Sequence, residues 1–126
     1  MNIIGIGIDA TDIPRIDRAI ARYGDRFLRR VFTDREIAYC SAKRHSAPSY
    51  AGRFAAKEAG MKALGTGHIL GVMWKDIEVV RGCGPPRLEF HGGALRRFQQ
   101  MGATAAFLTI THSDTLAMAQ VMLVAK

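Results

Sequence analysis

The chain has 126 residues, of which 48% are hydrophobic and 23% charged, a balance typical of one globular domain with a real core. Its formal net charge of +7 favours an anionic partner: a nucleic acid, a phosphorylated ligand or an acidic protein. No apolar run approaches the roughly 20 residues of a membrane span, and no signal peptide is recognisable. We therefore expect a single domain over 1–126 in the cytoplasm, with Cys40 and Cys83 as free thiols.

Isoleucines alternate with glycines over Ile3–Asp9, which predicts a strand with apolar side chains on one face. Glycines inside a strand suggest that a ligand or another backbone comes close. Asp9 ends this strand, where its carboxylate either reaches a site at the sheet edge or serves the following turn. Gly5–Ala10 also matches the dinucleotide fingerprint GxGxxA, but that pattern belongs between a strand and a helix, so we reject this interpretation.

An arginine-rich helix is expected from Asp12 or Ile13 to Arg22, with Pro14 in its first turn and a break at Gly24. Beside an apolar stripe run arginines at helical spacing. This face is either a solvated surface or a docking face for an acidic protein helix or a polyanion. The arginines are Arg15, Arg18, Arg22, Arg26 and Arg29.

Thr33 and Glu36 have the spacing of a capping box, which predicts a short helix to about Ala42. A longer helix is expected from near Pro48 or Ser49 to Gly65.

This longer helix carries four charged residues within ten positions. Glu58 and Lys62 form a favourable i,i+4 pair, whereas Arg53 and Lys57 repel each other unless an anion lies between them. The Gly65–Gly67 loop that follows offers free backbone N–H groups, which is a weak signal for phosphate binding.

The second half of the chain predicts mainly strands and turns. The last strand is apolar on both faces, so it needs additional cover that a subunit interface would provide. His112, in the turn before that strand, is either a plain exposed histidine or a hydrogen-bond donor to phosphate. The expected elements are a strand over Val72–Trp74 and Ile77–Val80 with a bulge between, a turn at Gly82–Pro86, strands at Arg87–Phe90, Ala103–Thr111 and Thr115–Ala125, and a helix at Ala94–Met101.

Three segments together carry a resemblance: GIGIDATDIPRI, RFAAKEAGMKALGTG and ITHSDTLAMAQV. In this order and spacing the sequence resembles the 4′-phosphopantetheinyl transferases, in particular the small bacterial holo-acyl-carrier-protein synthases, over essentially its whole length. The resemblance implies an α+β fold, with an antiparallel sheet wrapped around a long central helix. It also implies a homotrimer with a sheet-mediated interface and active sites shared between neighbouring subunits.

The implied activity transfers the 4′-phosphopantetheine arm of coenzyme A to a serine of apo acyl carrier protein and releases adenosine 3′,5′-bisphosphate. Asp9 and Glu58 would bind Mg²⁺, which prefers carboxylate and phosphate oxygens. With Lys62 they form the implied catalytic set, in which Glu58 is the candidate general base, directly or through a metal-bound water. Implied coenzyme A ligands are Arg53, Lys57, Lys62, Gly65, Thr66 and His112, and Arg15, Arg22 and Arg26 would dock the acidic carrier.

The sequence departs from the family pattern at Leu64, at His68 and over Asp114–Leu116, which affects fine ligand contacts and carrier preference. Three alternatives compete with this interpretation. A nucleic-acid-binding module would explain the charge, but would usually interleave aromatic with basic residues. A Mg²⁺-dependent phosphohydrolase would use the same acidic residues without an arginine stripe. A trimer that has lost activity would not need to retain Asp9, Glu58 and Lys62.

Overall fold

The computed structural model describes residues 1–67 and 71–126, so His68 lies outside the described residues. The elements confirm the predicted α+β class, and their order follows the predicted one closely. They are β1 (Asn2–Asp12), α1 (Ile13–Tyr23), α2 (Asp25–Val31), α3 (Asp34–Ser41), α4 (Ala47–Leu64), a 3-10 turn η1 (Trp74–Asp76), β2 (Ile77–Val80), β3 (Arg87–Phe90), α5 (Gly92–Gln100), β4 (Ala105–His112) and β5 (Leu116–Ala125).

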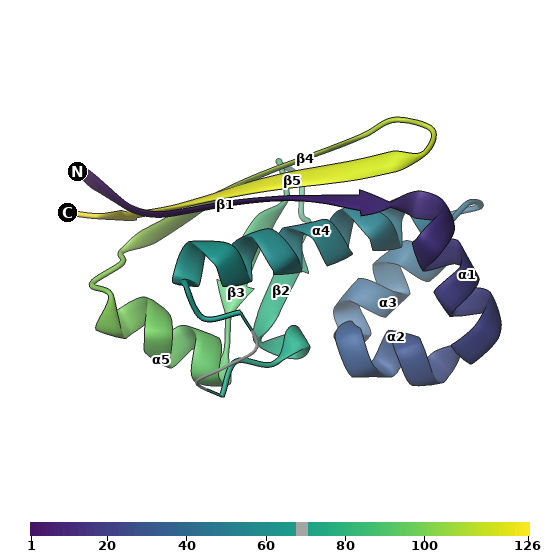
Figure 1. Ribbon diagram of the computed structural model, residues 1–126, viewed down its shortest axis with the longest axis horizontal. Coiled ribbons are helices and arrows are strands. Elements are labelled where there is room, and N and C mark those ends of the chain that lie inside the picture. Colours follow the sequence, from purple (N-terminus) through teal and green to yellow (C-terminus); the bar gives the residue numbers. More distant parts are fainter. Residues whose placement is uncertain (68–70) are drawn as a thin grey trace.

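The strands form two antiparallel sheets, not the single sheet that was expected. A three-stranded sheet with the order β1-β5-β4 runs along one side of α4, and the β2-β3 hairpin packs separately against the same helix. Figure 1 shows α1, α2 and α3 gathered near the N-terminal end of α4, and α5 near its C-terminal end. The long helix therefore packs against both sheets.

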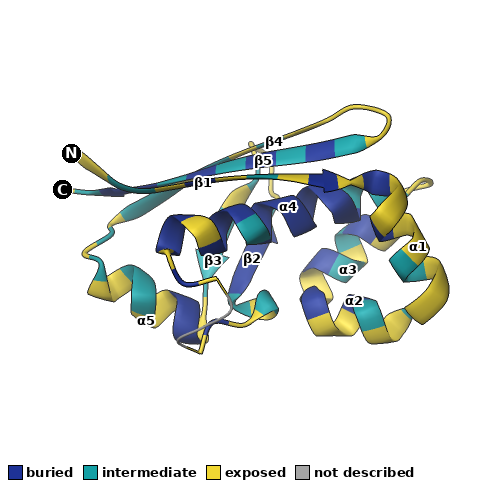
Figure 2. Ribbon diagram, viewed as in Figure 1, coloured by how far each residue is buried: buried dark blue, intermediate teal, exposed yellow. Residues whose placement is uncertain are grey.

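Helix α4 is buried along almost its whole length, as its dark colour in Figure 2 shows. Ala55, Ala56 and Ala59 are fully buried, and their small side chains let neighbouring elements approach the helix closely. The helix ends as predicted at Gly65, whose φ of 74° is the left-handed conformation of a C-terminal cap. Among the described residues, no helix is long and apolar enough to cross a membrane.

Strand β1 crosses α4 through its glycines. A Cβ on Gly7 would lie 1.9 Å from the Ala59 carbonyl oxygen, and one on Gly5 would lie 2.3 Å from that of Ala63. The glycines in this strand predicted the close approach of a ligand or another backbone. The structure shows that the backbone of α4 approaches them. Ile6 and Ile8 point away from the helix and remain 57% and 54% exposed in the isolated chain.

Local signals located the first three helices correctly. Pro14 lies in the first turn of α1, and Gly24 breaks α1 from α2 with a φ of 54°. The capping box is confirmed, because Thr33 Oγ1 accepts from the Glu36 N–H and Glu36 Oε1 accepts from the Thr33 N–H.

The predicted strand over Val72–Trp74 is wrong. The Asp76 N–H donates to the Met73 carbonyl, and Asp76 Oδ2 accepts from the Met73 N–H. These two hydrogen bonds close the chain into the η1 turn, so β2 begins only at Ile77.

Candidate active site

The crossing of β1 and α4 brings Asp9 and Lys62 together. Lys62 Nζ lies 3.2 Å from Asp9 Oδ1 and donates a 2.9 Å hydrogen bond to the Ile8 carbonyl. The Lys62 side chain is 53% exposed and that of Asp9 only 17%. A half-buried carboxylate thus lies beside an ammonium group that reaches solvent.

Glu58 lies one helical turn before Lys62, so its side chain emerges on the same face of α4. Within the described part of the chain, its half-buried carboxylate forms no ion pair and accepts no hydrogen bond. Asp9 and Glu58 therefore offer hard oxygen donors from neighbouring elements. This donor set fits a Mg²⁺ ion, which typically takes one or two carboxylates and completes its octahedron with phosphates and waters.

Gly65 and Thr66 follow directly on the Lys62 turn. Gly65 is exposed, whereas Thr66 is buried and its hydroxyl donates to the Gly67 carbonyl. The Arg97 guanidinium supports this loop from α5, because its Nε donates to the Leu64 carbonyl at 2.9 Å. Leu64, a departure from the family pattern, is a fully buried core residue.

Lys57 was expected to bind coenzyme A, but the structure places its side chain in the core. Its side chain is fully buried, with Nζ 2.7 Å from Glu36 Oε1 and donating to the carbonyls of Ile77 and Trp74. These three acceptors use all three N–H groups of the ammonium. Burial lowers the pKa of Lys57, and the adjacent Glu36 carboxylate opposes that shift.

Arg53 and His112 lie apart from Asp9 and Lys62, in a cavity of about 450 Å³ between α4 and β4. Arg53 is 7% exposed, and its Nε is buried without a hydrogen-bond partner among the described residues. Its guanidinium lies over the Tyr39 ring, 4.2 Å from the centroid. The Arg53 guanidinium therefore brings a positive charge to the lining of the cavity, which is suited to an anion.

Two further residues of this cavity, Tyr39 and Arg81, were missed from the sequence. Burial raises the pKa of Tyr39, but a hydrogen bond from Lys43 and the charges of Lys43, Arg81 and Arg53 leave it below its ordinary value. The cavity is therefore strongly electropositive. Because its cations come from separate loops and helices, no local motif in the sequence revealed it.

The predicted ligands consequently divide into two groups within one chain. Asp9 lies on β1 and His112 on β4, which are the opposite edges of the three-stranded sheet. Along α4, Arg53 and Lys62 are nine residues apart, which corresponds to about 14 Å of helix. One chain thus presents the carboxylate–lysine group and the arginine–histidine cavity at different edges.

The predicted docking arginines are all exposed on α1 and α2. The guanidinium of Arg15 lies 5.8 Å from the Phe54 ring centroid, and that of Arg22 lies 5.3 Å from the Tyr23 ring centroid. Arg26 borders a surface hollow with Tyr23 and Phe27. Their role in docking stays a prediction.

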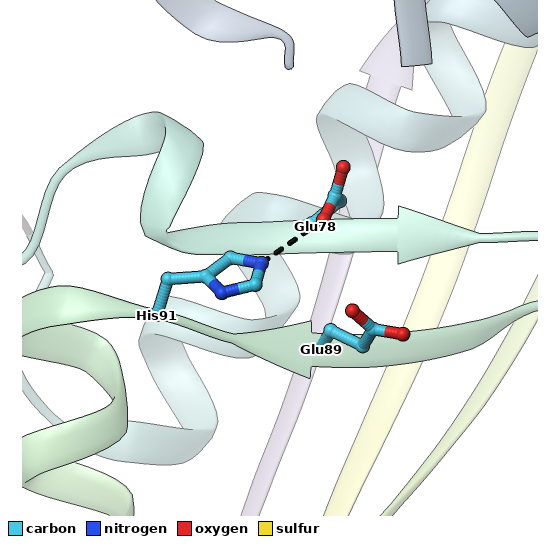
Figure 3. Close-up of side chains that lie close together, drawn as sticks. All are labelled: Glu78, Glu89 and His91. Carbon is cyan, nitrogen blue, oxygen red and sulfur yellow. Dashed lines mark hydrogen bonds and ion pairs between the residues drawn. The ribbon is translucent and has the colours of Figure 1, made fainter. Parts of the chain in front are cut away.

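A second acidic cluster lies on the β2–β3 hairpin, where ligand atoms of Glu78, Glu89 and His91 lie within 4.8 Å of one another (Figure 3). Arg35 Nη2 bridges Glu78 at 2.6 Å and Glu89 at 2.9 Å. Burial tends to raise the pKa of Glu78, but hydrogen bonds from Arg35, Thr33 and His91 lower it to about 2. With its oxygens already occupied by these donors, Glu78 fastens α3 to the hairpin and is poorly suited to bind a metal.

Comparison with known proteins identifies the family of this chain. The profile of the 4′-phosphopantetheinyl transferase superfamily matches residues 5–118. The chain is 48% identical to the holo-[acyl-carrier-protein] synthase of Solibacter usitatus, over 96% of this chain and 98% of the relative.

Solved structures give the same result. The crystal structure of the Neisseria meningitidis holo-[acyl-carrier-protein] synthase superposes with a TM-score of 0.88 at 28% identity, covering 97% of this chain and 98% of the other. The Helicobacter pylori holo-[acyl-carrier-protein] synthase, crystallised in complex with coenzyme A, superposes with a TM-score of 0.83 at 29% identity. The match covers 94% of this chain and 99% of the other. The chain belongs to the 4′-phosphopantetheinyl transferase superfamily.

Proposed function

We propose that this protein is a holo-acyl-carrier-protein synthase. It transfers 4′-phosphopantetheine from coenzyme A to a serine of apo acyl carrier protein, releases adenosine 3′,5′-bisphosphate and supports fatty acid biosynthesis in the cytoplasm. The observation that carries the proposal is the meeting of Asp9 with Lys62 at 3.2 Å, one helical turn from Glu58, whose carboxylate has no partner among the described residues. The names and coenzyme A complex of its relatives point the same way.

Asp9 and Glu58 would hold Mg²⁺ in this reaction. When bound, the ion neutralises the pyrophosphate of coenzyme A and stabilises the charge that develops on its oxygens. Glu58 would accept the proton of the attacking serine hydroxyl, since no cationic side chain among the described residues pairs with its carboxylate. Lys62 neutralises phosphate and protonates the leaving oxygen, for which its exposed ammonium is accessible.

The cavity at Arg53 would hold the nucleotide end of coenzyme A. A phosphate there would pair with the guanidinium charge of Arg53 and accept from His112, which lies at the end of β4. Arg81 and Tyr39 replace Lys57 in the expected ligand set, because they line the cavity and Lys57 does not.

A homotrimer would bring the carboxylate–lysine group of one subunit next to the arginine–histidine cavity of another. The exposed face of the three-stranded sheet carries Ile6, Ile8 and Phe107, each more than half exposed in the isolated chain. Contiguous apolar exposure of this kind marks an interaction surface. If the sheets pack together, the β1 edge of one subunit can adjoin the β4 edge of its neighbour, and one site receives residues from both.

The proposal is tested by mixing the protein with coenzyme A, Mg²⁺ and apo acyl carrier protein and measuring the mass of the carrier. We expect a gain of one phosphopantetheine group per carrier, and none when Mg²⁺ is chelated or the acceptor serine is replaced. No gain across several carriers would refute the proposal. Release of phosphate from coenzyme A without a carrier would instead support a phosphohydrolase.

A further inference from the structure

Thr11 is a buried polar residue at the edge of the proposed metal site. It is 2% exposed and lies on β1, two positions after Asp9, so both side chains project from the same face of the strand. Its hydroxyl donates a 2.8 Å hydrogen bond to Asp9 Oδ2. The neighbours across the ladder, Ala117 and Ala119, are small and leave room for this contact.

The two oxygens of Asp9 consequently have different partners. Oδ2 accepts from Thr11, and Oδ1 lies 3.2 Å from Lys62 Nζ. A carboxylate held at one oxygen by a buried donor loses the freedom to rotate about its last torsion, which is otherwise broad. Oδ1 is therefore kept on the side where the exposed Lys62 side chain reaches solvent.

We propose that Thr11 is a positioning residue, which orients Asp9 so that Oδ1 is presented to the divalent cation. This inference rests on the proposed function, in which Asp9 is a ligand of that cation. Hydrogen-bond partners of metal-binding carboxylates commonly affect metal affinity by about 10–100-fold. A purely structural role for the hydroxyl predicts a change in folding stability without a change in cation affinity.

Thr11→Val keeps the branched shape and removes the donor, whereas Thr11→Ser keeps the donor and removes a methyl group. Mn²⁺ is titrated into each variant saturated with coenzyme A, and free Mn²⁺ is followed by electron paramagnetic resonance. We expect Thr11→Val to weaken Mn²⁺ binding about tenfold and Thr11→Ser to stay within about threefold of the parent. Thr11→Ala, expected to behave like the valine variant, serves if that variant does not fold.

A second measurement uses the transfer reaction. The turnover lost in Thr11→Val should return when Mg²⁺ is raised, because mass action refills a weakened site, while KM for the carrier stays unchanged. Equal Mn²⁺ affinities for the parent and the valine variant would overturn the inference. Asp9→Asn is the control for the site: if it binds Mn²⁺ as tightly as the parent, the metal assignment itself fails, and the role of Thr11 with it.

Discussion

Lys57 and Glu36 form an ion pair of 2.7 Å in which neither side chain is exposed. Glu36 also caps α3 through the Thr33 N–H and accepts from the Val79 N–H of β2. Lys57 adds hydrogen bonds to the carbonyls of Trp74 and Ile77. One buried pair therefore fixes α4 to α3 and to the start of β2, directly beside Glu58.

We expect Lys57→Met to lower the free energy of unfolding by about 3–5 kcal/mol, because it leaves the Glu36 carboxylate buried and unpaired. The double variant Lys57→Met/Glu36→Gln should recover part of that loss, since no isolated charge remains. Lys62→Met is the exposed control and should shift stability by less than about 1 kcal/mol. Urea unfolding of the four proteins measures these differences, and a small effect of Lys57→Met alone would contradict the proposed coupling.

Lys57 also shows where prediction from sequence ends. Helix propensity, the Gly65 stop, the capping box and the strand glycines are local signals, and each of them located its element correctly. The charged residues of α4 are equally visible in the sequence. The residues that contact them in the fold, however, come from distant parts of the chain. Glu36 lies on another helix, so the sequence indicated an anion beside Lys57 without revealing that the protein itself supplies it.

The residues of the candidate site also differ in how far the sequence reveals them. Asp9, Glu58 and Lys62 stood out in the sequence because each belongs to a compact motif, and the structure brings Asp9 and Lys62 into contact. Arg81 and Tyr39 were missed because they reach the Arg53 cavity from separate parts of the chain. Separation of that cavity from the carboxylates follows from strand order, which depends on long-range pairing that local patterns do not encode.

Glu78 makes the stability of the fold depend on pH. Its pKa is lowered from 4.5 to about 2 in the folded protein, so folding favours the ionised carboxylate. The resulting stabilisation is complete above about pH 4.5 and is lost as the pH falls toward 2. Glu78→Gln removes this contribution, and Arg35→Met should reduce it by deleting a donor.

Urea unfolding at several pH values between 2 and 6 measures the effect. We expect the parent protein to lose stability more steeply than Glu78→Gln over this range, by up to about one proton in the linkage slope. Parallel curves for the two proteins would show that the hydrogen bonds around Glu78 do not perturb its ionisation.

The geometry of the site also depends on Gly7, which lies on the same strand as Asp9. An alanine there would place its Cβ 1.9 Å from the Ala59 carbonyl oxygen, so β1 and α4 would have to separate. We expect Gly7→Ala to cost at least about 1–3 kcal/mol of stability and to reduce transfer, because Asp9 moves with the strand. Gly82→Ala is the matched control, since an added Cβ meets nothing within 4 Å there. Thermal unfolding and transfer rates of both variants test this, and equal behaviour would exclude the close contact.

The arginines of α1 are expected to act on the carrier, not on coenzyme A. Arg22→Glu and Arg15→Glu should each raise KM for acyl carrier protein severalfold at low salt and leave KM for coenzyme A nearly unchanged, because complementary surface charge mainly assists encounter. Arg96→Glu makes the same charge change on the exposed face of α5, near the other end of the domain (Figure 1), and should have little effect. Parallel increases in both KM values would contradict a docking role.

Lys62 is expected to oppose cation binding before the substrate arrives. Its Nζ lies 3.2 Å from Asp9 Oδ1, so a divalent ion must share that oxygen with a positive charge. Lys62→Met should therefore bind Mn²⁺ more tightly than the parent in the absence of coenzyme A, by up to about tenfold, while losing most of its transfer activity. Lys62→Arg retains the charge and should leave Mn²⁺ affinity near that of the parent. If the methionine variant binds Mn²⁺ no better, Lys62 does not compete for Asp9, and its contact with Oδ1 has no bearing on the metal site.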